Sequence, residues 1–180
     1  MWLTAKQVAD FHRNSYVVVG PLVDASGLVR LRSAFDELIE RWAEECSTDR
    51  ASYERVVSQW TSVWSRHPVF AEHIHNQRMG DVARQLLDVA NLQLFHDHLI
   101  SKPPEHSETV PWHQDYPFWP VSAPRALSCW IPFEDVVADS GALRFMPGAH
   151  LDGEERAVDF LCRNKDWGPR ASEAVAVDVP

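Results

Sequence analysis

The sequence predicts a mainly β domain with helices in its N-terminal region. Apolar residues recur at helical spacing through much of the first half of the chain, and short apolar segments separated by turn residues follow in the second half. The 180 residues are enough for one hydrophobic core. We therefore expect a single domain, 1–180, with a helical packing region at 1–90 and a β core at 91–180.

The first predicted helix begins at Thr4. Its hydroxyl is a candidate N-cap, and Gln7 completes a capping box with it. Tyr16 and the three valines that follow it favour a short strand at 16–19, and Gly20-Pro21 then breaks the chain.

A longer helix is predicted to begin at Asp24 or Ser26. It carries apolar residues on one side and charged residues on the other, which indicates a helix that packs against a core. The apolar residues are Leu28, Leu31, Phe35, Leu38, Ile39 and Trp42, and the charged ones are Arg32, Asp36, Glu40 and Glu44. A short strand near 55–60 and two helices, near 67–75 and 78–89, are expected to lead into the β core.

The β core is expected to contain five strands. Their predicted ranges are 92–100, 113–118, 125–133, 142–146 and 174–179.

His113 and Asp115 are the most informative residues of the chain. On an extended strand, residues i and i+2 point to the same face, so an imidazole nitrogen and a carboxylate oxygen can converge on one metal ion. This pair would supply two of the three ligands of the facial triad that holds non-haem Fe(II). A lone His-x-Asp also arises by chance at a solvated strand end. The flanking sequence is therefore needed to distinguish a metal site from such a chance pair.

Four signals, one of which contains this pair, follow one another in order along the chain. They are a predicted strand ending in Lys102-Pro103, the motif Trp112-His113-Gln114-Asp115, the segment around Trp130 followed by Glu134-Asp135, and Gly141-Ala142-Leu143 followed by Pro147-Gly148-Ala149-His150. This order resembles the phytanoyl-CoA dioxygenase family of Fe(II)- and 2-oxoglutarate-dependent oxygenases. Ala149 stands where serine is commoner in that family.

The resemblance implies that the β core is a double-stranded β-helix, the jelly roll of cupin-like proteins. Such a fold needs about eight strands in two facing sheets, and the predicted strands fall short of that number. Three explanations remain open: the sequence is a fragment, another chain or a missing segment completes the barrel, or the protein is a degenerate relative without iron chemistry.

The resemblance also assigns roles to individual residues. It implies that His113 and Asp115 are iron ligands, and that Lys102 and Trp130 line the cosubstrate pocket, with His98 at another pocket-facing position. Tyr116 and Trp119 are candidates for the wall of a substrate pocket, although aromatic residues there can equally fill the core. Lys102 can alternatively extend from its strand end into solvent.

Two residues of the family pattern have no match in this sequence. Family members carry a second iron-binding histidine after the Pro-Gly-Ser-His turn, and an arginine later that grips 2-oxoglutarate. No histidine occurs between Leu151 and Pro180, so Arg156, Arg163 and Arg170 cannot be matched to that arginine. His150, His96 and His98 are substitute candidates, each with an alternative role as a hydrogen-bonded structural histidine.

The resemblance therefore predicts an Fe(II)- and 2-oxoglutarate-dependent dioxygenase that hydroxylates or otherwise oxidises a small organic molecule. Halogenases of this family lack the carboxylate ligand, so Asp115 favours hydroxylation over halogenation. The alternative is a non-catalytic jelly-roll protein or a degenerate relative with an incomplete iron site.

Composition and charge argue against several other classes of protein. A net charge of −9 and a pI near 5.4 argue against a nucleic-acid partner, which requires a basic surface. The chain contains no apolar run long enough for a membrane span and no signal-peptide core at its start, so we expect no membrane partner and a cytoplasmic location. The cysteines, 3 in number, are widely spaced and predict neither a disulfide framework nor a zinc site.

Overall fold

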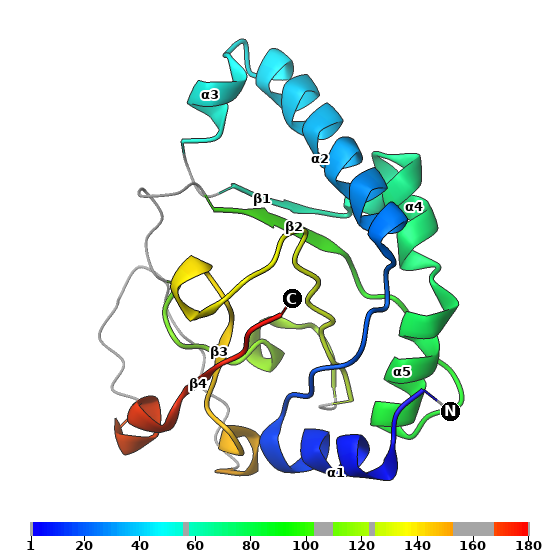
Figure 1. The fold of residues 1–180 in the computed structure, drawn as a ribbon, viewed down its shortest axis with the longest axis vertical. Coiled ribbons are helices and arrows are strands. Elements are labelled where there is room, and N and C mark those ends of the chain that lie inside the picture. Colours follow the sequence, from blue (N-terminus) through cyan, green and yellow to red (C-terminus); the bar gives the residue numbers. More distant parts are fainter. Residues whose placement is uncertain (1, 56–57, 103–109, 123–124, 153–167, 180) are drawn as a thin grey trace. The chain divides into compact units, whose positions relative to one another are not determined.

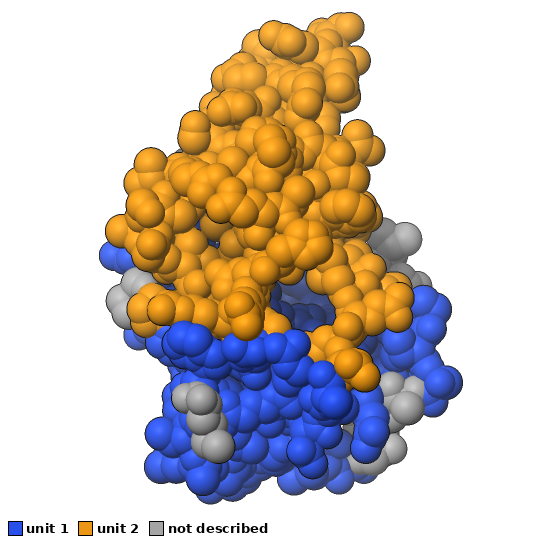
Figure 2. Space-filling view, turned by 90° about the vertical axis from the view of Figure 1, so that its right-hand side faces the viewer, with its two compact units in different colours: residues 1–20, 81–90, 110–180 blue, residues 21–80, 91–109 orange. Residues whose placement is uncertain are grey.

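The computed structural model describes residues 2–55, 58–102, 110–122, 125–152 and 168–179. The chain divides into two compact units (Figure 2). Unit 1 comprises Met1–Gly20, Asp81–Ala90 and Val110–Pro180, and unit 2 comprises Pro21–Gly80 and Asn91–Thr109. The predicted division into a helical region at 1–90 and a β region at 91–180 stays a prediction.

The helices and strands follow one another as labelled in Figure 1. The α-helices are α1 (Ala5–Asn14), α2 (Ala25–Glu45), α3 (Arg50–Tyr53), α4 (Pro68–Ile74) and α5 (Gln77–Leu87). The strands are β1 (Ser58–Thr61), β2 (His98–Ser101), β3 (Arg144–Phe145) and β4 (Val175–Ala176). The short 3₁₀ helices are η1 (Val63–Ser65), η2 (Tyr116–Phe118), η3 (Ala138–Ser140), η4 (Ala149–Asp152) and η5 (Gly168–Glu173). No helix in the described ranges has both the length and the apolar character needed to cross a membrane.

The predicted mainly β jelly roll is wrong for the described part of the chain. About 47% of it is helical and only 9% is strand. Its strands form two separate two-stranded antiparallel sheets, β1–β2 and β3–β4, and no closed barrel is formed by the residues described.

Missing strand partners and prolines explain this difference. The segments predicted as strands at 113–118 and 125–133 contain no strand in the structure. Proline has no N–H to donate to a ladder, and Pro111, Pro117, Pro120 and Pro132 interrupt this part of the chain. The segment 16–19 likewise contains no strand, and the strands predicted at 92–100, 142–146 and 174–179 are replaced by the shorter β2, β3 and β4.

Unit 2 is organised by α2. The carboxylate of Asp24 accepts a hydrogen bond of 2.7 Å from the Gly27 N–H and begins the helix, which selects Asp24 over Ser26 as its N-cap. Four of the six apolar residues predicted for its core-facing side are buried, whereas Leu28 and Phe35 are half-buried. Helix α4 packs against α2 and η1. The buried residues of α2 are Leu31, Ala34, Leu38, Ile39, Trp42 and Ala43.

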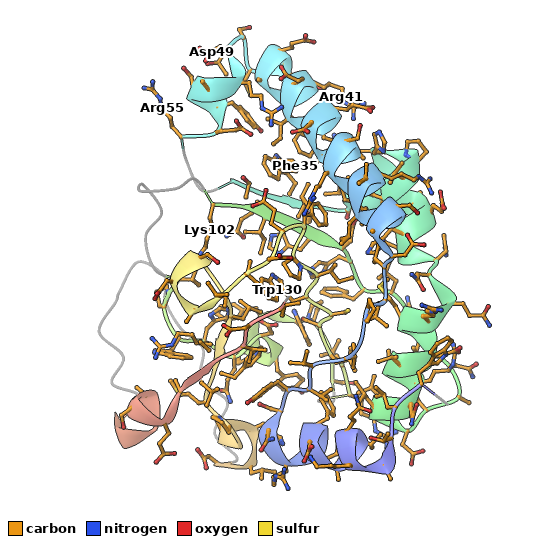
Figure 3. All side chains as sticks on the ribbon, in the orientation of Figure 1. Phe35, Arg41, Asp49, Arg55, Lys102 and Trp130 are labelled. Atoms are coloured by element: carbon orange, nitrogen blue, oxygen red, sulfur yellow. The ribbon has the colours of Figure 1, made fainter. Side chains whose placement is uncertain are left out.

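The β1–β2 sheet joins the core of unit 2. Trp60 of β1 pairs with Leu99 of β2, and Leu99 is buried. The Trp60 ring also stacks on Trp42 of α2, with 4.5 Å between ring centroids. Figure 3 shows the side chains that α2 carries, including Phe35 and Arg41. The helix and this small sheet therefore share one apolar cluster.

Unit 1 is held together by α1 and the segments around it. Thr4 and Gln7 form the predicted capping box at the start of α1. The side-chain amide of Gln85 accepts from the Leu3 N–H at 3.0 Å and donates to the Leu3 carbonyl at 2.7 Å. At the other end of α1, the His150 Nε2–H donates to the His12 carbonyl at 2.9 Å. The turn that contains His150 thus caps the helix.

Replacing Leu38 by alanine tests the core of unit 2. The Leu38 side chain is fully buried, so Leu38→Ala should lower the free energy of unfolding by about 2–5 kcal/mol. The matched control is Val29→Ala on the same helix, where the side chain is 62% exposed and the expected change is within about 0.5 kcal/mol. Urea unfolding followed by far-UV circular dichroism measures both, and equal effects of the two substitutions would contradict the packing described.

Candidate functional site

The His-x-Asp motif lies in a turn of unit 1 and not on a strand. Asp115 has φ −69° and ψ −37°, which is the helical region, and it directly precedes η2. The Phe118 N–H donates to the Asp115 carbonyl at 3.0 Å, and the Trp119 N–H donates to the Tyr116 carbonyl at 3.0 Å. The expectation that strand geometry aligns His113 and Asp115 is therefore wrong.

The two side chains nevertheless meet. The Nε2 atom of His113 lies 3.3 Å from Oδ1 of Asp115, and the side chains are 31% and 49% exposed. The other imidazole nitrogen of His113, Nδ1, is 2.9 Å from the Pro111 carbonyl oxygen. Because a carbonyl can only accept, Nδ1 carries a proton, and Nε2 is the nitrogen that can bind a metal when the ring is neutral.

Asp115 raises the pKa of His113 above its ordinary value. The hydrogen bond to the Asp115 carboxylate is the largest cause, because it stabilises the imidazolium. Partial burial of the ring opposes this shift, and the Pro111 carbonyl adds to it. Without a metal, Asp115 therefore favours the form of His113 in which Nε2 carries a proton that is shared with the carboxylate. A metal cation that binds both atoms has to replace this proton.

Ser128 is a contact of Asp115 that the sequence pattern did not predict. Its hydroxyl donates to Oδ2 of Asp115 at 3.2 Å, from a position 13 residues further along the chain. The segment around Ser128 matches the tryptophan-containing part of the family pattern, but serine spacing gives no signal for this contact.

Trp112, the residue before His113, contacts a cation. The guanidinium carbon of Arg144 on β3 lies 5.8 Å from the centroid of the Trp112 ring, in the range of a cation–π interaction. This contact ties the motif to the β3–β4 sheet within unit 1.

The structure distributes the other predicted site residues over both units. Tyr116 and Trp119 are half-buried in the turn that follows Asp115, and Trp130 is 38% exposed in the same unit. His98 is the first residue of β2 and Lys102 is the residue after this strand, so both belong to unit 2. The pocket roles predicted for these five residues stay predictions.

The histidines considered as a substitute third ligand make other contacts in the structure. His150 caps α1, which is the structural role considered for it. His96 precedes β2 and His98 begins it, and their rings contact edge to face with 6.1 Å between ring centroids. Their role as substitute ligands stays a prediction. Arg156 and Arg163 lie outside the described residues.

An open pocket of about 400 Å³ lies elsewhere in unit 2, beside α2 and β1. Trp42, Tyr53 and Trp60 contribute its aromatic lining, and it contains none of the predicted site residues.

The His113–Asp115 pair fits two ligand positions of a metal ion. Two donor atoms that bind one ion at right angles, each about 2.1 Å away, are about 3 Å apart, close to the separation of Nε2 and Oδ1. The hydrogen bond that the Pro111 carbonyl accepts from His113 and the one that Ser128 donates to Asp115 are of the kind that orient metal ligands. Within the described ranges, no group of three or more histidine, cysteine or acidic residues is arranged to hold a metal ion.

Comparisons with known proteins find relatives with oxidative activities. The chain is 24% identical over 165 residues to a probable phytanoyl-CoA dioxygenase from Caenorhabditis elegans, covering 82% of this chain and 53% of that protein. It is 28% identical over 155 residues to an ectoine dioxygenase from Sphingopyxis alaskensis, covering 82% and 50%. It is 34% identical over 76 residues to an L-proline trans-4-hydroxylase from Streptomyces griseoviridis, covering 39% and 28%.

The chain thus spans about half the length of the curated relatives that it matches most extensively. A family model described as phytanoyl-CoA dioxygenase (PhyH) matches residues 11–180, which includes the His113–Asp115 pair and nearly all of the sequence. The chain therefore belongs to the phytanoyl-CoA dioxygenase family.

Proposed function

We propose that this chain provides iron-binding residues of an Fe(II)- and 2-oxoglutarate-dependent dioxygenase that hydroxylates or otherwise oxidises a small organic molecule. The observation that carries the proposal is the contact of 3.3 Å between His113 Nε2 and Asp115 Oδ1. Family membership supports a dioxygenase of this type, and the named relatives include an ectoine dioxygenase and a proline hydroxylase.

His113 and Asp115 would hold the metal. The Pro111 carbonyl fixes the imidazole so that Nε2 faces the carboxylate, which leaves an imidazole nitrogen and a carboxylate oxygen side by side. A neutral imidazole and a carboxylate are two of the three ligands of the facial triad that holds non-haem Fe(II). When bound, iron and 2-oxoglutarate supply the oxidising chemistry, while the protein supplies orientation and a shielded site.

Asp115 favours hydroxylation over halogenation. Its carboxylate takes a coordination position that an enzyme transferring a halide has to leave open. Two oxygens of one carboxylate also bring negative charge to the site, which helps to retain a divalent cation.

Aromatic side chains next to the pair would form part of the substrate pocket. Tyr116 directly follows Asp115 and Trp119 lies four residues after it, and these half-buried residues can exclude water while they contact an apolar part of a substrate. Trp130, in the same unit as the pair, is proposed to line the cosubstrate pocket, on the strength of the family pattern.

The third ligand and the arginine for 2-oxoglutarate are proposed to come from outside the described residues. The matched relatives are about twice as long as the matched segment, so further sequence or a partner chain could provide both. A relative that lacks them would be non-catalytic, which is the outcome that the following experiment detects.

Metal binding can be tested directly in the full-length gene product. Fe(II) and 2-oxoglutarate added without oxygen should give a weak visible charge-transfer band, and His113→Ala should abolish it because one metal ligand is lost. The control is His75→Ala, at the exposed end of α4 in unit 2, which should keep the band. A wild-type protein that gives no band is a non-catalytic relative, and the proposal is then wrong.

The pH dependence of metal binding gives a second test. A metal must displace the proton that Asp115 stabilises on His113, whose pKa is raised. Below that pKa the affinity for Fe(II) should fall about tenfold for each pH unit, and above it this dependence should disappear. Titrations between about pH 5 and pH 8 measure the slope, and an affinity that stays constant over this range would argue against His113 as a ligand.

A further inference from the structure

The two oxygens of the Asp115 carboxylate have different partners. Oδ1 lies 3.3 Å from His113 Nε2, whereas Oδ2 accepts a hydrogen bond of 3.2 Å from the hydroxyl of Ser128. All three residues belong to unit 1. The serine thus contacts the oxygen that does not face the imidazole.

The backbone around Asp115 does not by itself direct the carboxylate. Asp115 occupies the N-cap position of η2, where an aspartate commonly accepts from the N–H groups of the helix, but its side chain makes no capping hydrogen bond. The final torsion of an aspartate side chain is only weakly restrained, and this side chain is 49% exposed. A hydroxyl donor to one oxygen therefore helps to decide which way the other oxygen points.

We propose that Ser128 is a positioning residue for the metal site, which rests on the proposed function of His113 and Asp115. Its hydroxyl occupies Oδ2, so that Oδ1 is presented beside His113 Nε2 and the carboxylate binds the metal through one oxygen. A carboxylate bound in this way takes one coordination position instead of two, which leaves room for the cosubstrate and O₂ in a facial triad.

Hydrogen bonds to metal ligands change metal affinity by a typical amount. Removing a side chain that orients a metal ligand typically weakens metal binding by roughly 10- to 100-fold. A serine that only ties residue 128 to residue 115 would change thermal stability and leave the affinity of the folded protein for metal unchanged. The two roles are therefore separable by measurement.

The test uses Co(II), a redox-stable probe, with the full-length gene product. Ser128→Ala should weaken Co(II) binding by roughly 10- to 100-fold while His113→Ala abolishes it. Ser128→Thr keeps a hydroxyl and should bind nearly as well as the wild type, whereas Ser128→Val has the shape of threonine without the hydroxyl and should bind as poorly as alanine. Ser122→Ala, at an exposed serine of the same unit, should have no effect.

The visible spectrum of bound Co(II) provides the second readout. Without the Ser128 hydroxyl, Oδ2 is released and can also bind the metal, so the d–d bands of Ser128→Ala and Ser128→Val should differ from those of the wild type and Ser128→Thr. The comparison of threonine with valine keeps the test valid if alanine impairs folding.

Two outcomes would overturn this inference, and they can be told apart from failure of the proposed function. If wild-type protein binds Co(II), His113→Ala does not, and Ser128→Val matches Ser128→Thr in affinity and spectrum, Ser128 does not position the ligand, although the proposed function stands. If wild-type protein does not bind Co(II), both the site and the role of Ser128 are wrong.

Discussion

The contact between His113 and Asp115 is the interaction on which the functional account depends. It places an imidazole nitrogen 3.3 Å from a carboxylate oxygen on a half-exposed turn, where two such groups have little reason to be held together for stability alone. Hydrogen bonds from both sides fix the arrangement: the Pro111 carbonyl orients the imidazole, and Ser128 contacts the far oxygen of the carboxylate. The site is thus built from a short loop and one residue brought to it from a later segment.

Features of the fold that depend on neighbouring residues were predictable from the sequence, whereas features that depend on distant residues were not. The capping box of Thr4, the N-cap Asp24 and the buried side of α2 were predictable, because each depends on residues within a few positions of one another. The sheets were not predictable in this way, because a strand needs a hydrogen-bonded neighbour, which is often far away in sequence. The apolar pattern at 125–133 resembles a strand, yet this segment has no strand assignment in the structure.

In the candidate site, too, contacts between neighbouring residues were easier to predict than contacts between distant ones. The side chains of His113 and Asp115 meet, but not on the strand that the sequence predicted, since Asp115 has a helical backbone conformation. Their role as metal ligands stays a prediction. Side chains two residues apart can meet in more than one backbone conformation. His113 and Asp115 therefore lie close together although the predicted strand is absent. Ser128 could not be found in this way, because no periodicity relates it to Asp115.

The most direct measurement is a crystal structure of the full-length gene product, grown without oxygen in the presence of Fe(II) and 2-oxoglutarate, with anomalous diffraction recorded at the iron edge. The account predicts one strong anomalous peak about 2.1 Å from both His113 Nε2 and Asp115 Oδ1. An iron peak bound by other residues, or iron-free density with these two side chains turned apart, would contradict it.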